Sequence, residues 1–368
     1  MERESLKFRL SPLNQFTNQS RFYFKYVFFR IFMKILTVEN LVYLTKKHGL
    51  KNIFNGIRNE IYKDFRNWDT FNKCPRIANH SNEGVIELMP ISNKNIYSMK
   101  YVNGHPNNYK YNLPTVMAYG MLSNVTTGEP FLISELTFST AIRTACTSVM
   151  GAQILARDNC KSMAIIGNGA QSEFQALAFY HLMGIKNFKL YDIDKKASEK
   201  LVKNLSKFSS INTIITNNTF DACKDVDIIT TITADKAYRT IIDKHMISLG
   251  QHINAVGGDC PGKTELSKDV LLSSSVFTEY TPQTRIEGDI QQMPSDFPVT
   301  ELQEIIKTNK RYTRKNNEIT VFDSVGFALE DYSTLNFYNN LSNKYRVGEN
   351  INLISKTNDP KNLFSLLK

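Results

Sequence analysis

The stretch that decides the fold is SMAIIGNGAQSEFQ, residues 162–175. A short apolar run leads into a glycine-rich turn, and the turn leads into a helical pattern. Gly167 and Gly169 have no side chains, so the backbone amides of this turn can approach a pyrophosphate, and the dipole of the following helix faces the anion. Ser172 stands at the third glycine position of the dinucleotide fingerprint. The motif alone therefore leaves a dinucleotide site and an ordinary tight turn both open.

The residues that follow this turn repeat a strand, helix, strand order. A helical pattern runs from Gln171 to about Leu182, and FKLYDID at 188–194 is typical of the next strand. Asp192 ends that strand, where a carboxylate accepts hydrogen bonds from the adenosine ribose and repels a 2′-phosphate. Asp194 adds negative charge there, although two exposed turn acids would have the same spacing. The pattern favours NAD over NADP.

Further apolar runs continue this alternation towards the C-terminus. They are INTIITN at 211–217, VDIITTIT at 226–233, HINAVGG at 252–258, SSVFTEY at 274–280 and EITVFDSVG at 318–326, with a helix-like TFDACKD at 219–225. Strands that alternate with helices predict a doubly wound parallel sheet. We therefore predict an α/β fold with a Rossmann domain over residues 151–326.

The part of the chain before this domain has a different pattern. We expect a short strand at 34–39, one amphipathic helix from Asn40 to about Asp69, and a long helix at 137–158 that leads into the next domain. Four apolar runs separated by turn signals predict antiparallel strands: VIELMPIS at 85–92, IYSMKYVN at 96–103, TVMAYGMLSN at 115–124 and PFLISEL at 130–136. Residues 33–150 are thus predicted to form a mixed α+β domain.

The two ends of the chain are expected to lie outside this scheme. Residues 1–32 are basic and aromatic and interpreted as an N-terminal appendage, or alternatively as the result of a mis-assigned start with Met33 as the true one. Residues 327–368 begin with a helical pattern that we expect to pack back on the first domain.

Composition narrows the classes of function. The 368 residues are 42% hydrophobic and 22% charged, as in an ordinary globular protein, and the net charge of +10 comes from Lys and Arg interspersed with Asp and Glu. We expect no nucleic-acid partner. No stretch has the length of a membrane span, and the five cysteines form no CxxC pair, which favours a cytoplasmic enzyme without a metal site. Cys260 is interpreted as a small residue in a tight turn, with a reactive thiol as the alternative.

The second informative stretch is GQHINAVGGDCPGKTEL, residues 250–266. Glycines and a proline break regular structure after a predicted parallel strand and leave Asp259 at the apex of the turn. Ligands bind at this end of the strands in open α/β sheets, so a carboxylate there is a candidate proton acceptor. The alternative is an Asp that caps a helix beginning near Lys263.

Four charged residues of the first domain are further candidates. Arg143 lies in a helix of mostly small and apolar residues, where it needs an anionic partner or a route to water. Arg76 and Lys100, taken singly, are more typical of solvated surface charges. Glu87 is flanked by apolar residues and is a plausible buried acid, although strand alternation allows it to face water.

Several of these segments together resemble the ornithine cyclodeaminase and mu-crystallin family. The resemblance rests on GGDCPGKTEL, IGNGAQSEFQALAF, MKYVNGHPNN, LPTVMAYGMLSNVTTGEP and the Arg143 helix, and it covers Met33 to about the C-terminus. The Asp259 loop points to the ornithine cyclodeaminase branch, because other members vary it. The resemblance implies a homodimer, joined through the sheets of the first domain, that converts L-ornithine to L-proline and ammonia by internal hydride recycling through NAD.

The resemblance also implies roles for individual residues. Asp259 would donate and accept the proton, Glu87 would face the substrate amines, and Arg76, Lys100, Arg143 and Val325 would contact the substrate. The cofactor positions that it implies are Thr115, Arg143, Gly167, Gly169, Ala170, Gln171, Asp192, Thr231, Ile232, Asn254, Ala255 and Ser324.

Alternatives to this interpretation stay open. They are a related NAD-dependent amino-acid dehydrogenase, a lysine cyclodeaminase, a cyclic imine reductase, and a cofactor binder without catalysis, against which the intact set of Asp259, Lys100 and Arg143 argues. A neutral Lys100 acting as a base is also open.

Overall fold

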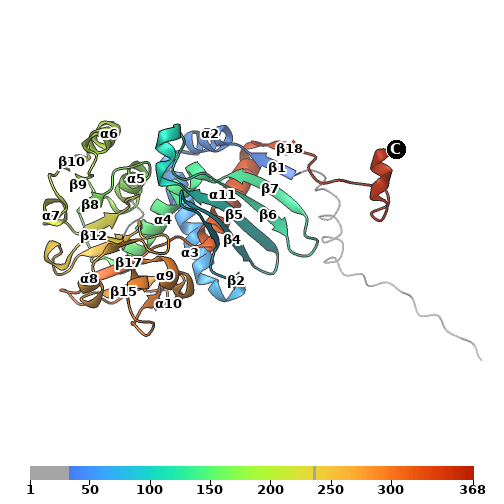
Figure 1. The fold of residues 1–368 in the computed structure, drawn as a ribbon. Helices are drawn as coiled ribbons and strands as arrows, with labels where there is room; N and C mark the ends of the chain where they lie inside the picture. The colour runs from blue at the N-terminus through green and yellow to red at the C-terminus, as the bar shows by residue number, and fades with distance from the viewer. Residues whose placement is uncertain (1–32, 235–237) are drawn as a thin grey trace, which may run out of the picture.

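A computed structural model describes residues 33–234 and 238–368, so the expectations for the appendage at 1–32 lie outside the described residues. Two eight-stranded sheets dominate the molecule, one at each end of the view in Figure 1. Among the described residues, no helix combines the length and the apolar character needed to cross a membrane.

The sheet of the second half is parallel throughout, in the order β10-β9-β8-β11-β13-β17-β15-β16. Its strands are β8 (Ser162–Ile166), β9 (Asn187–Tyr191), β10 (Asn212–Ile215), β11 (Ile228–Thr231), β13 (His252–Ala255), β15 (Ser275–Thr278), β16 (Thr300–Glu301) and β17 (Thr320–Asp323). The chain proceeds outward from β8 to β10 and then returns to β11 on the other side of β8. The predicted doubly wound fold is confirmed, and its reversal between β8 and β11 is where such sheets bind ligands.

Six helices lie in the connections of this sheet among the described residues. They are α5 (Ser172–Met183), α6 (Lys195–Leu205), α7 (Thr219–Cys223), α8 (Lys268–Leu272), α9 (Thr281–Glu287) and α10 (Leu302–Lys307). The sequence patterns predicted α5 and α7 but not the other four. A separate two-stranded ribbon pairs β12 (Tyr238–Ile242) with β14 (Thr264–Leu266). β12 follows the turn after β11, and β14 follows the turn after β13, so the ribbon lies next to the carboxyl edge of the parallel sheet.

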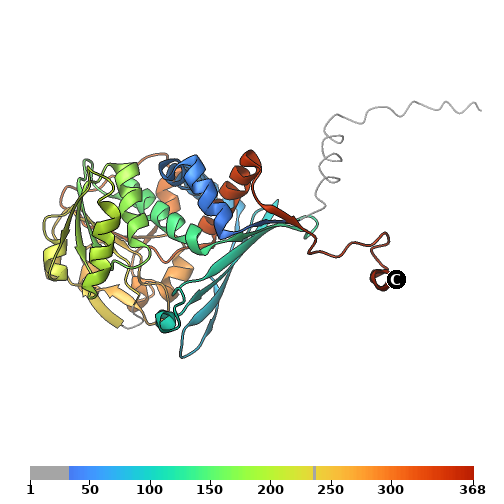
Figure 2. The ribbon, with the colours of Figure 1, turned by 90° about the horizontal axis from the view of Figure 1, so that it is seen from above.

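The sheet of the first half is mixed, in the order β18-β1-β7-β6-β5-β4-β2, with β3 paired to β4. Its strands are β1 (Met33–Leu36), β2 (Asn72–Lys73), β3 (Ile77–His80), β4 (Val85–Ser92), β5 (Ile96–Gly104), β6 (Ala118–Asn124), β7 (Pro130–Glu135) and β18 (Glu349–Ile351). The four predicted strands appear as β4 to β7, joined antiparallel. In Figure 2 the helices lie on one side of this sheet, and we call its other side the outer face.

The prediction of a single helix from Asn40 to about Asp69 is wrong, because this stretch is divided. The structure has two helices, α2 (Val38–His48) and α3 (Leu50–Arg66). Gly49 separates them at φ 88°, a conformation that L side chains rarely adopt, and its amide hydrogen-bonds the carbonyl of Thr45. The chain therefore turns at Gly49 where the apolar spacing alone predicts a continuous helix.

Two long helices join the halves of the molecule. α4 (Thr137–Leu155) is almost wholly buried and crosses the domain boundary expected at residue 150. Gly151 lets it approach the parallel sheet, because an added Cβ would lie 2.5 Å from the ring of Phe322. α11 (Ala328–Tyr345) packs against α3 and the inner side of the mixed sheet. We predicted that the C-terminal helix packs back on the first domain, and α11 does so at the junction. Residues 352–368 extend away from it (Figure 1).

Candidate active site

A cleft of about 360 Å³ lies at the junction, bordered by the carboxyl edge of the parallel sheet and the inner side of the mixed sheet. It brings together residues that are far apart in the sequence. The predicted site residues that line it are Arg76, Glu87, Lys100, Thr115, Arg143, Gly169, Ala170, Gln171, Ile232, Asp259, Ser324 and Val325.

The glycine turn after β8 forms one wall of this cleft. Gly167 has φ 92°, and an added Cβ would lie 2.8 Å from the carbonyl oxygen of Ile232, so no larger residue fits. Gly169, in contrast, has no heavy atom within 4 Å of an added Cβ and faces open space. The hydroxyl of Ser172 donates to the carbonyl of Gly169 at 2.8 Å and fixes the start of α5. The turn therefore fits a group that approaches its backbone closely, as a pyrophosphate does.

Asp192 lies at the end of β9 beside this turn. Its carboxylate accepts hydrogen bonds from the backbone amides of Asn168 at 2.6 Å and Asp194 at 2.8 Å. Asp194 itself caps α6, since its side chain accepts from the amide of Lys196 at 3.0 Å. The cap explains the position of Asp194, whereas Asp192 ties the end of β9 to the glycine turn.

Five of the predicted cofactor residues are not among those that line the cleft, and Asp192, beside the glycine turn, is one of them. Gly167 supports the turn from behind, and Thr231, Asn254 and Ala255 are fully buried within β11 and β13. Asn254 uses its side-chain amide within the sheet, donating to the hydroxyl of Thr230 at 3.3 Å. These strand residues lie beneath the cleft, because both strands are covered on their two faces.

Arg143 and Lys100 share an acidic partner on α11. The Nε of Arg143 lies 3.1 Å from Asp331 Oδ1, and its Nη1 lies 2.6 Å from Glu330 Oε2. The Nζ of Lys100 lies 3.0 Å from the same Asp331 oxygen. All of these side chains are buried, so the anionic partner that the sequence required for Arg143 is supplied by α11.

Burial also changes the protonation of this cluster. It lowers the pKa of Lys100 to about 8, against the opposing attraction of Asp331. It raises the pKa of Glu330 to about 8, although the nearby Arg143 favours the carboxylate. Burial therefore shifts both Lys100 and Glu330 towards their neutral forms relative to exposed side chains of the same kind.

Arg76 links the mixed sheet to the turn after β17. The side chain of Arg76 is only 6% exposed and that of Lys100 only 1%, so the solvated positions that their local sequences suggested are both wrong. Nη1 lies 2.9 Å from Glu87 and Nε 2.9 Å from Glu287, while Nη2 donates to the carbonyls of Val325 and Gly326. Glu87 is buried on the inner side of β4, as one of the two interpretations predicted.

Asp259 lies in the irregular turn after β13, and its side chain is 52% exposed. The alternative role of a helix cap near Lys263 is wrong, because Thr264–Leu266 forms β14 and the next helix, α8, is capped by Ser267. The carboxylate instead lies 3.2 Å from the Nζ of Lys263. Asp259 thus projects at the cleft and is available for contact with a ligand.

Sequence reasoning missed a set of buried charged residues around the cleft. They are Lys263, Glu265, Glu279, Glu287, Asp289, Asp323, Glu330 and Asp331. Most of these carboxylates hold turns: Glu279, for example, accepts a hydrogen bond of 2.6 Å from the hydroxyl of Ser324. Glu330 and Asp331 follow the apolar run GFAL, so the argument applied to Glu87 would have identified them as buried acids.

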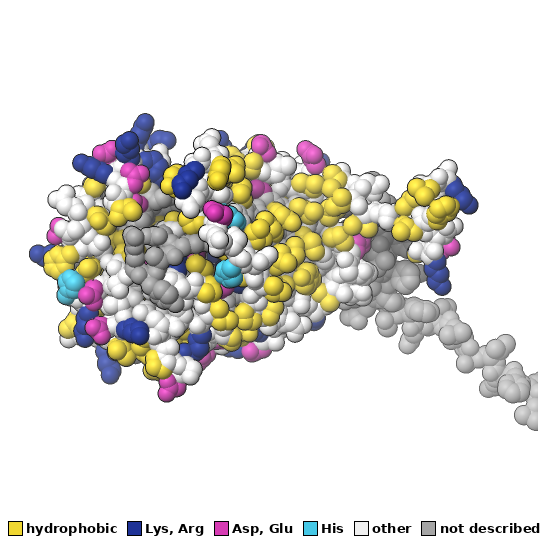
Figure 3. All heavy atoms as spheres, in the orientation of Figure 1, with side chains coloured by type: hydrophobic (Ala, Val, Ile, Leu, Met, Phe, Trp, Pro, Cys, Tyr) yellow, Lys and Arg dark blue, Asp and Glu magenta, His cyan; other side chains and the backbone are white. Residues whose placement is uncertain are grey.

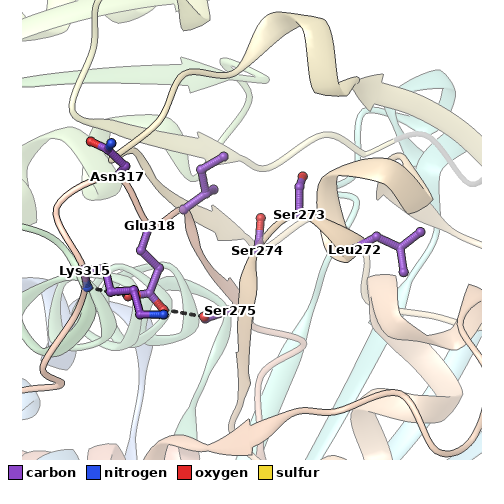
Figure 4. Close-up of a pocket in the computed structure, with 8 residues that line it drawn as sticks. Leu272, Ser273, Ser274, Ser275, Lys315, Asn317 and Glu318 are labelled. Atoms are coloured by element: carbon purple, nitrogen blue, oxygen red, sulfur yellow. Dashed lines mark hydrogen bonds between the residues drawn. The ribbon is translucent and has the colours of Figure 1, made fainter.

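A second hollow lies elsewhere, at the amino-terminal ends of β15 and β17. It is lined by Leu272–Ser275, Lys315 and Asn317–Ile319, and Figure 4 shows Glu318 bound to Ser275 there. None of the predicted site residues lines it, and ligands of open α/β sheets bind at the opposite edge. Among the described residues, no group of His, Cys, Asp and Glu has the arrangement of a metal site. Cys74 is exposed, whereas the other four cysteines are buried, including Cys260 in its tight turn.

Known proteins share both the sequence and the fold. The chain is 46% identical over 332 residues to an ornithine cyclodeaminase of Brucella suis, covering 90% of this chain and 92% of the relative. It is 47% identical over 332 residues to an ornithine cyclodeaminase of Agrobacterium fabrum, covering 90% and 94%. Among solved structures, an archaeal alanine dehydrogenase dimer with bound NAD superposes with a TM-score of 0.79 at 26% identity, covering 88% of this chain and 99% of that one.

A profile of the ornithine cyclodeaminase/mu-crystallin family matches residues 38–344, a range that includes the whole parallel sheet and every residue that lines the cleft. The chain belongs to the ornithine cyclodeaminase/mu-crystallin family.

Proposed function

We propose that the protein is an NAD-dependent ornithine cyclodeaminase, which converts L-ornithine to L-proline and ammonia. One observation carries the proposal: the glycine turn at 169–171, the cation cluster and Asp259 line a single cleft. The names of the relatives at 46% and 47% identity support this activity over the other reactions of the family.

The cleft fits NAD on the evidence of its own residues. The open space at Gly169, the start of α5 and the carboxylate of Asp192 suit a pyrophosphate and a ribose without a 2′-phosphate. We assign Gly169, Ala170 and Gln171 to the pyrophosphate, and Thr115, Ile232 and Ser324 to the nicotinamide side. When bound, NAD supplies a hydride acceptor for the substrate and later returns the hydride.

The charges around the substrate side suit a diamino acid. Arg143 is held by Glu330 and Asp331 through Nε and Nη1, and we assign its Nη2, together with Lys100 and Arg76, to the α-carboxylate. The buried Oε1 of Glu87 has no hydrogen-bond partner within the described residues. We assign this oxygen to a substrate amine, because an unsatisfied buried carboxylate oxygen is costly until an ammonium group reaches it.

Asp259 is assigned to proton transfer. It accepts a proton as the α-amine is oxidised and can return one later in the cycle. The cations and Glu87 hold the substrate so that its own δ-amine reaches Cα, where intramolecular attack gains an effective concentration on the order of 10⁵ M or more. Val325, at the cleft wall, would limit the space beside the substrate chain.

We also propose that the protein is a cytoplasmic homodimer. The support for dimerisation is the outer face of the mixed sheet, which exposes Ile86, Leu88 and Tyr119 and stacks Tyr101 on Tyr119 at 5.1 Å. Figure 3 shows an apolar band over this region, and bands of this kind mark protein interfaces. Light scattering on the wild type and on Leu88→Glu tests it: we expect a dimer that the charge weakens, and a monomeric wild type would contradict it.

A substrate panel tests the proposed activity. The purified protein with NAD is given ornithine, lysine, alanine or arginine, and products are identified by mass. We expect proline and ammonia from ornithine at the highest rate. Faster turnover of lysine would favour a lysine cyclodeaminase, and NADH accumulation from alanine would favour a dehydrogenase.

A further inference from the structure

Lys263 is a buried lysine at the cleft that the proposed roles leave unused. Its side chain is 5% exposed although it lines the cleft, and it directly precedes β14. A buried ammonium group is costly unless nearby acceptors satisfy it. Lys263 has two: the carbonyl oxygen of Thr233 at 2.8 Å and Asp259 Oδ1 at 3.2 Å.

The contact with Thr233 does not by itself explain this lysine. Glu265, two residues further along, accepts hydrogen bonds from the amide of Thr233 at 2.9 Å and from its hydroxyl. Its other oxygen accepts from the amide of Gly257 at 3.0 Å. Glu265 therefore already ties the turn after β11 to the turn after β13. Lys263 differs from Glu265 in its contact with Asp259, which Glu265 does not make.

The contact matters because Asp259 is otherwise weakly held. Its side chain is half exposed, and within the described residues Lys263 is the partner with which it forms an ion pair. Exposed side chains sample several rotamers, and each additional rotamer reduces the time that a carboxylate spends in a reactive position. The other ionisable groups that act on Asp259 are Arg76 and Glu287 on α9, and those that act on Lys263 are Glu265 and Cys260.

We propose that Lys263 is a positioning residue for Asp259: its ammonium group, held in place by the carbonyl of Thr233, fixes the carboxylate in one orientation at the cleft. Lys263 stays protonated throughout and transfers no proton. The inference rests on the proposed function, because it assumes that Asp259 is the group that exchanges protons with the substrate.

Kinetics of matched variants test the proposal. Lys263→Met keeps the apolar stem and removes the charge, whereas Lys263→Arg keeps a cation that can span both acceptors. With NAD saturating, we expect kcat for ammonia release to fall by roughly 10- to 100-fold in Lys263→Met, since misplacement of a catalytic group by about 1 Å has an effect of this size. Lys263→Arg should recover most of the loss. In an Asp259→Asn background, Lys263→Met should produce little further loss.

A second measurement needs no turnover. In a double-mutant cycle on the midpoint of thermal unfolding, Lys263→Met should lower Tm more in the wild type than in the Asp259→Asn background. Additive Tm changes would mean that no interaction links the two residues and would overturn the proposal, as would a Lys263→Met protein with wild-type kcat. If Lys263→Met does not fold, the same cycle is run with Lys263→Gln. A wild type that releases no ammonia would instead contradict the proposed function, while the cycle would still report on the pair.

Discussion

The substitution Asp259→Asn distinguishes a catalytic role of this residue from a structural one. The substitution removes the negative charge and the ability to accept a proton, while the side chain keeps nearly the same size. If Asp259 is the proton acceptor, ammonia release should fall by roughly 10²–10⁴-fold, the usual contribution of general acid–base catalysis.

The structure predicts that folding and cofactor binding survive this change. The ion pair with Lys263 is half exposed on the aspartate side, so its loss should cost at most about 1 kcal/mol of stability. Lys263 retains the carbonyl of Thr233 as a partner, and the residues assigned to NAD lie elsewhere along the cleft. We therefore expect a Tm within a few degrees of the wild type and a nearly unchanged Kd for NAD.

The assay must report ammonia, because the proposed reaction leaves NAD unchanged overall. Circular dichroism and NAD titration serve as controls for folding and cofactor binding. A folded Asp259→Asn protein that releases ammonia within about tenfold of the wild-type rate would refute the catalytic assignment.

Three further predictions follow from the same structure. Fluorescence titration should give tighter binding of NAD than of NADP because of Asp192, and equal or tighter binding of NADP would contradict that role. A protein that starts at Met33 should keep full turnover in the ammonia assay, since residues 1–32 contribute no assigned site residue, and loss of activity would show that the N-terminal segment is needed. The pKa values of Glu287 and Glu330 are raised by burial to about 7 and 8, so the folded state binds more protons than the unfolded state above about pH 4.5. Stability should then decrease as pH rises from about 5 to 8, with a smaller decrease in Glu330→Gln, and a Tm that rises over this range would contradict the assignment.

Much of the fold could be predicted from local patterns. The glycine turn at 167–169 and the apolar runs around it indicate a parallel sheet, because such strands are buried on both faces. The short strands β2, β3, β16 and β18 have only two to four residues, too few to show an alternation. They form because a neighbouring strand offers unpaired backbone groups, and this depends on the tertiary structure.

The candidate site also has residues that the sequence could identify and residues that it could not. Arg143 could be identified because a cation in an apolar helix requires a partner. Its anionic partner, Asp331, is 188 residues away in the sequence, and a single sequence carries no signal that the two meet. In the sequence, Lys263 could be interpreted only as a possible helix boundary. Its contacts with Thr233 and Asp259 depend on the shape of a glycine-rich turn, and glycines allow many backbone conformations, so the sequence does not determine that shape.

The most direct test of the proposed function is the stoichiometry of ammonia release when NAD is limiting. L-ornithine in large excess is given to the purified protein with NAD at about one-hundredth of its concentration, and ammonia, proline and NADH absorbance are followed together. The account predicts that ammonia and proline form in equal amounts, far beyond the NAD supplied, with no accumulation of NADH. Ammonia release that stops at the amount of NAD, with NADH formed in proportion, would contradict it.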